Sequence, residues 1–432
     1  MTTLRQAKRV YFIGIKGAGM TALAQVLKGW GKTVSGSDTA DIFFTDDVLK
    51  KEKIRVVAPF RAGNLPAADL VIRSTAYTAS NNVEVKTAVK KKLPMMTYPQ
   101  AVGQLFAGRY GIAVCGTHGK TTTSAMLTFV LKELGLDPTA IIGSAVPQLG
   151  GSACVGQGQY LVVEADEYQN KLRHYRPRAI ILTSADWDHP DYFKNQAAYN
   201  RVFIDFIKRL PKDGLLIAFQ DDKNVRVIAK HARCRVVWYG KKGPRLPLAV
   251  PGDHNQWNAA AVVTLCQSLT LPKQKVIAAL KRFTGTKRRF ELLGEKKGVK
   301  VYDDYAHHPA EVIATLQAVR QQFKKNRLIV AFQSHTYTRT KALLPAFAKA
   351  FRLADEVIVL DIFGSAREKH GSITPEKLAA AIHRQSRNAS YRGNFSAVVD
   401  YLTDHVRRGD VVIVMGAGEN WKVGVGLLKK LK

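Results

Sequence analysis

The segment IAVCGTHGKTTTS at residues 112–124 combines glycines, a lysine and threonines in an order that suits phosphate binding. An apolar run precedes Gly116 and Gly119, and a stretch with an apolar helical face follows them. Backbone N–H groups at such a turn bind phosphate, the lysine reaches the β- and γ-phosphates, and the threonine hydroxyl binds Mg²⁺. The usual spacing G-x-x-x-x-G-K-[ST] requires a glycine where this chain has Val114. An ordinary strand–turn–helix is the alternative, and the position of Gly-Lys-Thr at the junction favours the phosphate site.

Acidic side chains follow two later apolar runs. Glu164, Asp166 and Glu167 lie in VVEADEY, and Asp188, His189 and Asp191 lie in ADWDHPD. Ligands of open α/β sheets bind beyond the carboxyl ends of the strands. A carboxylate there can hold Mg²⁺, and an imidazole beside carboxylates suits metal binding or proton transfer. Either segment alone could be a polar loop, but two of them in one sheet with the lysine motif predict a site.

Polar loops of the same kind occur near both ends of the chain. GIKGAG at 14–19 resembles a dinucleotide fingerprint with Lys16 in place of its middle glycine, and Asp38 stands about 20 residues further on. This pattern indicates a nucleotide more than it indicates a nicotinamide cofactor. DDYAHHP at 303–309 and QSHTYTRTK at 333–341 each follow a predicted strand, where their side chains would suit a cleft.

The elements that must position these residues alternate between strands and helices in three segments. The first contains the strands RVYFIGI, KTVSGSD and DLVIRST, and the second has GIAVC, QYLVVEAD, AIILTSAD, GLLIAF and CRVVWYG. FTGTKRRF is the predicted linker to a third segment, with VKVYDDY, RLIVAFQ, DEVIVLDIF and GDVVIVM as strands and a helix predicted over KALLPAFAKAF. We therefore predict an α/β protein with three domains. They are a Rossmann-like domain at 1–107, a central P-loop ATPase-type domain with a mostly parallel sheet at 108–286, and a Rossmann-like domain at 287–432.

Composition narrows the class of protein. The chain has 432 residues, a hydrophobic share of 46% and four cysteines without metal-site spacing. No apolar run is long enough for membrane insertion and no signal peptide is recognised, so a cytoplasmic location is expected. The net charge of +32 favours anionic partners. Nucleic acid is not the expected partner, because the lysines are scattered and lack an aromatic-rich RNA-binding signature.

Together these motifs resemble the Mur ligase family over essentially the whole chain. GTHGKTTT, EADEY, RRFE and DDYAHHP, in this order, are the most specific elements. The resemblance implies ATP and Mg²⁺ as cofactors, and UDP-N-acetylmuramate and an amino acid, L-alanine above all, as substrates. The implied reaction phosphorylates the muramyl carboxylate, after which the amino group displaces phosphate through a tetrahedral intermediate. Such a phosphoryl transfer requires charge neutralisation by lysine and Mg²⁺.

The resemblance also implies roles for individual residues. The implied catalytic residues are Lys120, Glu164, His189, His307 and Arg339, and the implied metal ligands are Thr121, Glu164 and His189. The implied ATP site comprises Gly116, Thr117, His118, Gly119, Lys120, Thr121, Thr122, His254, Asn255, Asn258, Arg289 and Asp304. The implied UDP-sugar site comprises Gly17, Ala18, Gly19, Met20, Asp38 and Ser74, and Tyr305 and Arg339 are implied in the amino-acid site.

Two departures from the family pattern bear on specificity. Lys16 replaces a glycine of the UDP loop, and Thr336 stands where an arginine is expected to hold the amino acid's carboxylate. No lysine lies between Lys194 and Lys208, so a carbamylated lysine is not predicted. Two alternatives remain: a recycling ligase that joins a whole peptide to UDP-muramate, and a basic nucleic-acid-binding P-loop protein.

Overall fold

The computed structural model describes residues 3–43, 45–364, 368 and 370–431. The chain divides into two compact units. The first comprises Met1–Asp186, Ala197–Pro247 and Trp257–Thr284, and the second comprises Trp187–Gln196, Leu248–Gln256 and Gly285–Lys432. Two sheets belong to the first unit and one to the second. The predicted α/β class with three domains is confirmed.

The first sheet has the order β3-β2-β1-β4-β5 and is parallel throughout. Its strands are β1 (Arg9–Ile13), β2 (Thr33–Ser37), β3 (Arg55–Val57), β4 (Leu70–Arg73) and β5 (Met95–Thr97). Its helices are α1 (Ala18–Gly29), α2 (Asp46–Lys51), α3 (Val83–Lys90) and α4 (Tyr98–Leu105), with a 3-10 turn η1 (Ala62–Asn64). The sequence pattern missed β3 and β5 because runs of three residues are too short to show a period.

The second sheet has the order β12-β11-β10-β6-β9-β7-β8, and only its pair β7–β8 is antiparallel. Its strands are β6 (Tyr110–Cys115), β7 (Thr139–Val146), β8 (Gly151–Cys154), β9 (Tyr160–Glu164), β10 (Ala179–Leu182), β11 (Leu215–Phe219) and β12 (Arg235–Tyr239). The helices are α5 (Lys120–Glu133), α6 (Gln196–Ile207), α7 (Lys223–Ala229), α8 (Asp253–Ser268) and α9 (Lys273–Arg282), with 3-10 segments η2 (Pro147–Leu149) and η3 (Tyr168–His174).

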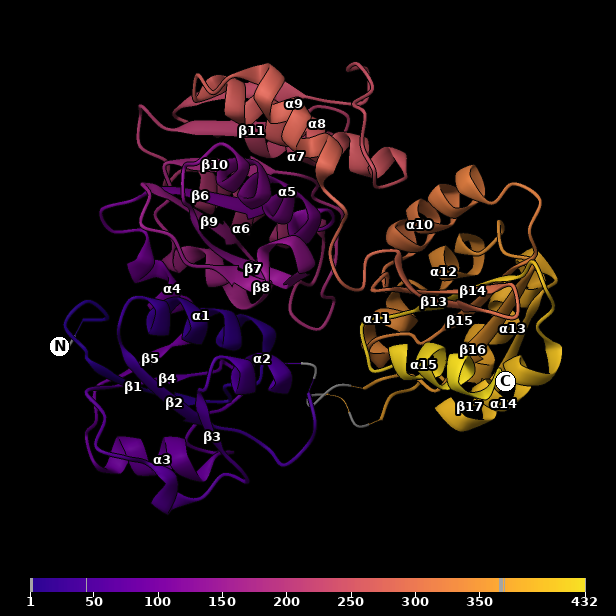
Figure 1. Cartoon of the computed structure of the whole chain (residues 1–432), viewed down its shortest axis with the longest axis horizontal. Coiled ribbons are helices and arrows are strands. Elements are labelled where there is room, and N and C mark those ends of the chain that lie inside the picture. Colours follow the sequence, from indigo (N-terminus) through magenta and orange to yellow (C-terminus); the bar gives the residue numbers. More distant parts are fainter. Residues whose placement is uncertain (1–2, 44, 365–367, 369, 432) are drawn as a thin grey trace. The chain divides into compact units, whose positions relative to one another are not determined.

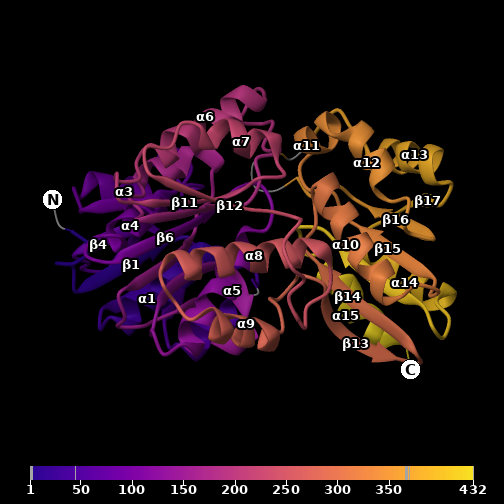
Figure 2. The ribbon, with the colours of Figure 1, turned by 90° about the horizontal axis from the view of Figure 1, so that it is seen from above.

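Packing joins these two sheets within the first unit. Helix α1 contacts β7 and β8, as Figure 1 shows. Helix α5, which begins at the lysine motif, is covered by α9 (Figure 2). The strands β6, β9 and β10 are buried and mostly hydrophobic except at one end of β6 and of β9, as expected for parallel strands covered on both faces. Their polar residues therefore gather at the carboxyl ends.

The third sheet has the order β13-β14-β18-β15-β16-β17, and only β13–β14 is antiparallel. Its strands are β13 (Glu291–Lys296), β14 (Val299–Asp304), β15 (Leu328–Phe332), β16 (Glu356–Leu360), β17 (Ala389–Gly393) and β18 (Val411–Met415). The helices are α10 (Pro309–Gln322), α11 (Tyr337–Ala342), α12 (Leu344–Ala350), α13 (Pro375–Ser386), α14 (Phe395–His405) and α15 (Trp421–Lys430).

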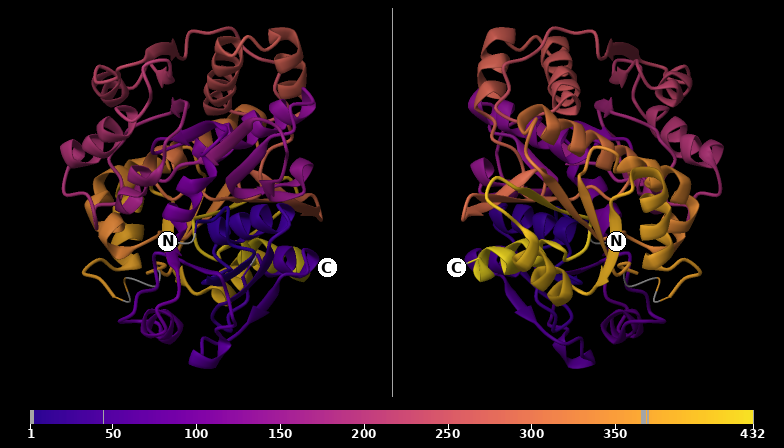
Figure 3. Two further views of the ribbon diagram at one scale, coloured as in Figure 1. Left: turned by 90° about the vertical axis from the view of Figure 1, so that its left-hand side faces the viewer. Right: turned by 90° about the vertical axis from the view of Figure 1, so that its right-hand side faces the viewer.

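Alternation along the strands of this sheet builds two cores. Val330 and Phe332 of β15 pack with α10, α12 and α13, whereas Ile329 and Ala331 pack with α14 and α15. Helices thus cover both faces of the sheet, the orange and yellow ribbon of Figure 3. This arrangement is the doubly wound one that the sequence predicts.

The helix predicted over KALLPAFAKAF is wrong in its boundaries. The structure has two helices there, α11 and α12, and α11 begins within QSHTYTRTK, which the sequence pattern treats as a loop. Thr336 starts α11, because its hydroxyl accepts a hydrogen bond from Arg339 N at 3.4 Å. Pro345, in the first turn of α12, has no N–H to continue the hydrogen bonding of α11, so the helix is interrupted at Leu343.

Candidate functional site

The lysine motif forms a tight turn between β6 and α5. Val114 is a residue of β6, and the turn needs glycine at two positions. Gly116 has φ +130, and a Cβ there would lie 2.4 Å from Thr183 Oγ1. Gly119 has φ +79, and a Cβ there would lie 2.5 Å from Asn258 Oδ1. The missing first glycine is therefore no defect, because the strand occupies its place.

The turn is held by the end of the neighbouring strand β10. Thr117 N donates to Ser184 O at 3.1 Å, and His118 N donates to Ser184 Oγ at 2.8 Å. His118 Nε2 lies 3.2 Å from a carboxylate oxygen of Asp186. Thr122 follows in the first turn of α5 and is half-buried. The backbone of the whole predicted phosphate segment is thus fixed at the edge where β6 and β10 end.

Carboxylates surround the Lys120 ammonium. Its Nζ lies 3.2 Å from Glu167 Oε2 and 3.1 Å from Thr117 O. Burial alone would lower the pKa of Lys120, but Glu167, Asp166 and Glu164 outweigh it and raise the pKa above its ordinary value. The ammonium is therefore charged at neutral pH and set among acidic groups.

Thr121 and Glu164 form the oxygen pair expected for a divalent cation. Thr121 Oγ1 donates to Glu164 Oε1 at 2.8 Å, and Gly143 N donates to Glu164 Oε2 at 2.5 Å. A hydroxyl and a carboxylate are ligands that Mg²⁺ accepts. A Cβ at position 143 would lie 2.6 Å from Glu164 Oε1, so glycine lets the backbone approach the carboxylate. This donor set fits Mg²⁺.

Sequence reasoning missed a buried tyrosine that ties the motif together. Tyr199, on α6, donates to Glu167 Oε1 at 2.8 Å, and its hydroxyl lies 2.9 Å from Thr117 Oγ1. It is fully buried. Tyr199 follows the DH segment by ten residues and carries no motif, so only its burial in a polar region identifies it.

The predicted UDP-sugar residues lie at the carboxyl ends of β1, β2 and β4. Asp38 Oδ2 accepts a hydrogen bond from Lys16 N at 2.7 Å, directly before Gly17, Ala18, Gly19 and Met20. Burial raises the pKa of Asp38 above its ordinary value. A Cβ at Gly19 would lie 2.7 Å from Tyr98 Oη, so this glycine lets α4 approach α1. Ser74 N donates to Ile13 O at 2.9 Å and completes the same edge.

The side chain of Lys16 contacts the segment that follows β2. Its Nζ donates to Asp41 O at 2.7 Å and lies 3.3 Å from Asp46 Oδ1. The side chain is buried. The ammonium of Lys16 is therefore bound to residues of the segment after β2.

In the second unit, Arg339 and Asp188 form a buried ion pair. Arg339 Nε donates to Asp188 Oδ1 at 2.8 Å, and Nη2 donates to Oδ2 at 3.2 Å. Burial alone would raise the pKa of Asp188, but Arg339 holds it well below the ordinary value. His189 Nε2 lies 3.8 Å from Asp188 Oδ2. His189 is thus placed with Arg339, whereas Thr121 and Glu164 belong to the first unit.

Histidines gather around this ion pair. Arg339 Nη1 lies 3.0 Å from His335 Nδ1, and the rings of His335 and His307 are 5.8 Å apart. The ring of His307 also meets that of Tyr305 at 5.3 Å. Burial lowers the pKa of His307 to about 4, so this imidazole is neutral at neutral pH. A neutral imidazole can accept a proton from an attacking amine.

The DDYAHHP loop is anchored by Asp304. Its carboxylate accepts hydrogen bonds from Phe290 N and Ala306 N, each at 2.8 Å. The guanidiniums of Arg288 and Arg289 lie 5.0 and 5.1 Å from the Tyr305 ring centroid. The structure therefore brings Asp304, Tyr305 and Arg289 together, as one cluster of the second unit.

The segment GDHNQWN, at residues 252–258, contributes to both units. Asn258 Oδ1 accepts from Thr123 Oγ1 at 3.2 Å next to Gly119, within the first unit. His254 and Asn255 belong to the second. Burial, and then the charge of Arg289, lower the pKa of His254 to about 4. Asn255 Nδ2 donates to Pro251 O at 2.6 Å.

Comparison with known proteins follows the same three segments. Residues 9–110 match a model described as Mur ligase family, catalytic domain. Residues 114–247 match the Mur ligase middle domain, and residues 288–418 match the Mur ligase, glutamate ligase domain. Among the described residues, no helix is both long and apolar enough to cross a membrane.

Individual relatives match over nearly their whole length. The chain is 38% identical to the UDP-N-acetylmuramate–L-alanine ligase of Desulfitobacterium hafniense, over 97% of this chain and 99% of the relative. The solved UDP-N-acetylmuramate-alanine ligase of Thermotoga maritima superposes with a TM-score of 0.83 at 27% identity, covering 98% of both chains. A murein peptide ligase from Psychrobacter arcticus, with a TM-score of 0.75 at 23% identity over 98% of both chains, shares the fold.

Proposed function

Because the chain belongs to the Mur ligase family, we propose that it joins L-alanine to the carboxylate of UDP-N-acetylmuramate in an ATP-dependent reaction of peptidoglycan precursor synthesis. The observation that carries the proposal is the P-loop turn, in which Lys120 and Thr121 face Glu167 and Glu164. The names of the relatives supply the substrate class. A cytoplasmic location and domain boundaries near residues 107 and 286 belong to the same proposal.

The P-loop turn suits phosphoryl transfer to a carboxylate. A carboxylate is a poor electrophile until it is phosphorylated, and the γ-phosphate carries negative charge that must be balanced. The ammonium of Lys120, kept charged by its acidic neighbours, would move from Glu167 and Thr117 O to the phosphates. The backbone N–H groups of residues 119–122 at the start of α5 add a second source of positive potential.

Thr121 and Glu164 would hold Mg²⁺. Held by these two residues, the ion would supply positive charge to neutralise the phosphates. The Thr121 hydroxyl donates to Glu164 Oε1 at 2.8 Å, so the two ligands lie next to each other.

The cluster of the second unit suits the amino-acid step. Three of the five N–H groups of Arg339 are directed at Asp188 and at His335 Nδ1. Its Nη1 also lies 3.4 Å from His335 O, which accounts for a fourth. This guanidinium is therefore held in one orientation. The neutral imidazole of His307 would accept the proton that the amine loses when it attacks the acyl phosphate.

Phosphate release tests the proposal directly. The protein is mixed with ATP, Mg²⁺ and UDP-N-acetylmuramate, and L-alanine, other amino acids or a muramyl-type tripeptide is added in turn. We expect release to depend on UDP-N-acetylmuramate and to be fastest with L-alanine. Faster release with the tripeptide would instead identify a peptide-recycling ligase. Salt-sensitive RNA binding without phosphate release would support the nucleic-acid alternative that the charge of +32 raises.

A further inference from the structure

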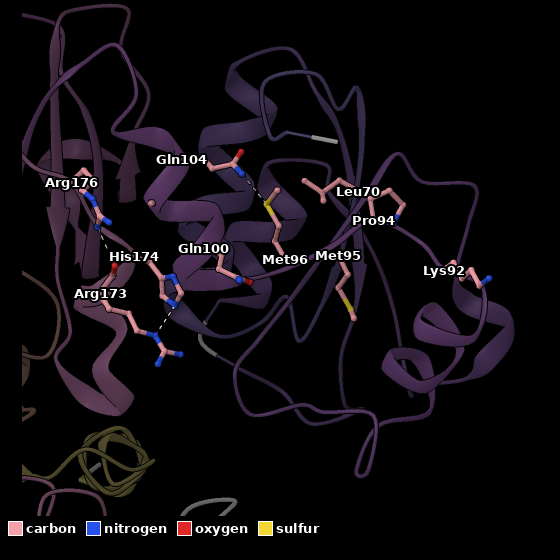
Figure 4. A pocket seen from close by; sticks show the side chains of 11 residues that line it. Leu70, Lys92, Pro94, Met95, Met96, Gln100, Gln104, Arg173, His174 and Arg176 are labelled. Carbon is pink, nitrogen blue, oxygen red and sulfur yellow. Dashed lines mark hydrogen bonds between the residues drawn. The ribbon is translucent and has the colours of Figure 1, made fainter. Parts of the chain in front are cut away.

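A cavity of about 870 Å³ lies within the first unit, beside α4 and the end of η3 (Figure 4). This volume is in the range of small-molecule pockets. The cavity is lined by Leu70, Lys92, Pro94, Met95, Met96, Gln100, Gly103, Gln104, Arg173, His174 and Arg176. None of the roles inferred above for ATP, Mg²⁺, UDP-sugar or amino acid involves these residues.

The cavity opens at the edge of the first sheet opposite to the nucleotide loop. Leu70 begins β4, and the predicted UDP residue Ser74 follows its end. Leu70 and Ser74 are four positions apart along an extended chain, which corresponds to about 13 Å. Met95 likewise begins β5, and Lys92 and Pro94 precede it. A ligand in the cavity would therefore occupy a place separate from the carboxyl edge.

One wall of the cavity is cationic, because its two arginines are exposed while the residues next to them in the chain are buried. Leu172 and Tyr175 are buried, and the Tyr175 ring stacks on Phe106 at 5.6 Å. Anchoring Tyr175 leaves Arg173 and Arg176 exposed on the lining of the cavity. The close approach of Gly103 to His174 fixes the wall to α4, since a Cβ there would lie 2.3 Å from His174 O.

The positive charge of this wall is not neutralised by the protein. None of the residues that line the cavity, all of which the structure describes, is acidic. In the described part of the chain, Lys92, Arg173 and Arg176 form no ion pair with a carboxylate. Arg173 donates to His174 Nε2 at 3.2 Å, which requires an unprotonated nitrogen there. Burial, reinforced by Arg173, lowers the pKa of His174, in agreement with a neutral ring.

The opposite side of the cavity is apolar with two amide groups. Leu70, Pro94, Met95 and Met96 supply aliphatic and thioether surface, which adapts to ligands of irregular shape. Gln104 is already engaged, because Nε2 contacts Met96 Sδ at 3.4 Å and Oε1 accepts from Leu4 N at 2.6 Å. Figure 4 shows the methionines and the arginines on different sides of the same space.

We propose that this cavity binds a molecule with a phosphate group on an apolar body, the phosphate against Arg173 and Arg176 and the body against the methionines. Guanidinium groups bind phosphate by paired charge-assisted hydrogen bonds. Arg173 Nε donates to His174 and Arg176 Nη1 donates to backbone oxygens, and the other N–H groups of the two arginines have no partner among the described residues. The ligand could be a soluble alkyl or aryl phosphate or the headgroup region of a phosphate-bearing lipid. The chemistry that recognises them is the same.

Calorimetry with octyl phosphate below its micelle concentration tests the proposal. The full chain is saturated with ADP and Mg²⁺ so that the P-loop is occupied. We expect binding to the unaltered protein, binding about 10-fold weaker with inorganic phosphate, and no binding with octanol. The double substitution R173A/R176A should weaken octyl phosphate binding by about 10-fold or more. Met95→Gln, which keeps the volume of the side chain, should weaken octyl phosphate and leave inorganic phosphate unchanged.

The matched control is R178A/R235A, which removes the same charge from exposed positions outside the cavity. It should bind octyl phosphate like the unaltered protein. Equal binding by R173A/R176A and the unaltered protein, or octanol binding as tight as that of octyl phosphate, would overturn the proposal. Melting temperatures of all variants identify any that fail to fold, and Met95→Gln then decides. The readout is binding, so it is independent of whether the ligase reaction is correct.

Vesicles distinguish the two sources of the phosphate. Co-sedimentation with phosphatidic acid vesicles that R173A/R176A loses and R178A/R235A retains would assign a lipid headgroup. Sedimentation that is the same in both variants, together with octyl phosphate binding that only R173A/R176A loses, would assign a soluble ligand.

Discussion

Lys120 at the start of α5 and Arg339 in α11 are both cations held by a carboxylate, but their surroundings differ. Lys120 lies 3.2 Å from Glu167 and is also in the field of Asp166 and Glu164. Arg339 meets one carboxylate, Asp188, through two hydrogen bonds of 2.8 and 3.2 Å. Glu311 and Asp191 also act on Arg339, so both cations lie among several carboxylates. The difference is that Arg339 is fixed to one carboxylate at two points, whereas Lys120 contacts one at a single point.

The difference indicates that the first site takes part in the reaction and that the second holds the structure in place. Several carboxylates around one lysine give the site a net negative charge, which a divalent cation offsets. The ammonium is then available to bind phosphates. An arginine in a two-point pair with one carboxylate is fixed in position, since the planar guanidinium matches the carboxylate. Substitutions at the first site should therefore affect turnover, and substitutions at the second should affect stability first.

The largest effect is expected at the lysine. Lys120→Ala removes the charge that balances the transferred phosphate, so phosphate release should fall by about 10³-fold. Binding of UDP-N-acetylmuramate, measured by calorimetry, should change little because its predicted residues lie on another sheet. Lys132→Ala, an exposed lysine near the other end of α5, is the control. Turnover by Lys120→Ala at the unaltered rate would contradict the P-loop assignment.

The next effect is expected at the arginine's partner. Asp188→Asn removes the carboxylate that is hydrogen-bonded to the buried Arg339 guanidinium, which should lower the free energy of unfolding by about 3–5 kcal/mol. Urea denaturation measures it. Asp213→Asn breaks an exposed pair with Arg178 and should cost less than about 1 kcal/mol. Similar losses in the two variants would show that the Arg339 pair is not the stronger one.

The contributions of His307 and Lys120 to the stability should change in different pH ranges. Burial lowers the pKa of His307 to about 4, so between pH 6.5 and 4 the unfolded chain binds a proton that the folded chain does not. Stability should therefore fall as pH falls through this range, by at most about 1.4 kcal/mol per pH unit from His307. The raised pKa of Lys120 gives stability that is complete below its unfolded pKa and is lost only as pH rises beyond it.

Denaturation at pH 7, 6 and 5 measures the contribution of His307. The lowered pKa values of His254 and His335 contribute to the same decline, so His307→Gln should make it less steep without abolishing it. Lys120→Ala should leave the slope in this range unchanged. A decline that is as steep in His307→Gln as in the unaltered chain would assign it to other groups.

The smallest effect is expected at Thr336. An arginine at this position would add a charge-assisted contact to the amino acid's carboxylate, so Thr336→Arg should lower the KM for L-alanine by about 5-fold with kcat little changed. Thr336→Ser keeps the hydroxyl that accepts from Arg339 N and should leave the KM unchanged. A KM for L-alanine that is the same in Thr336→Arg and the unaltered chain would exclude a direct contact.

Short motifs predicted much of the first unit. The segment 112–124 contains its own strand end, its two glycines and its helix start, so the turn followed from neighbouring residues. Thr336 and Pro345 were visible in the sequence too, but their effect on the helix boundaries was missed. Apolar helical spacing alone does not show that a hydroxyl starts α11 or that a missing N–H ends it.

By itself, the sequence determined the α/β class, the order of the motifs and the family to which the chain belongs, because these depend on patterns within about 15 residues. Only the tertiary structure decided which side chains meet. Asp188 and Arg339 are 151 residues apart, and Tyr199 reaches Thr117 across 82. The cationic cavity likewise combines two stretches, 70–104 and 173–176. Such contacts form where packed elements bring distant segments together, and no local pattern records that packing.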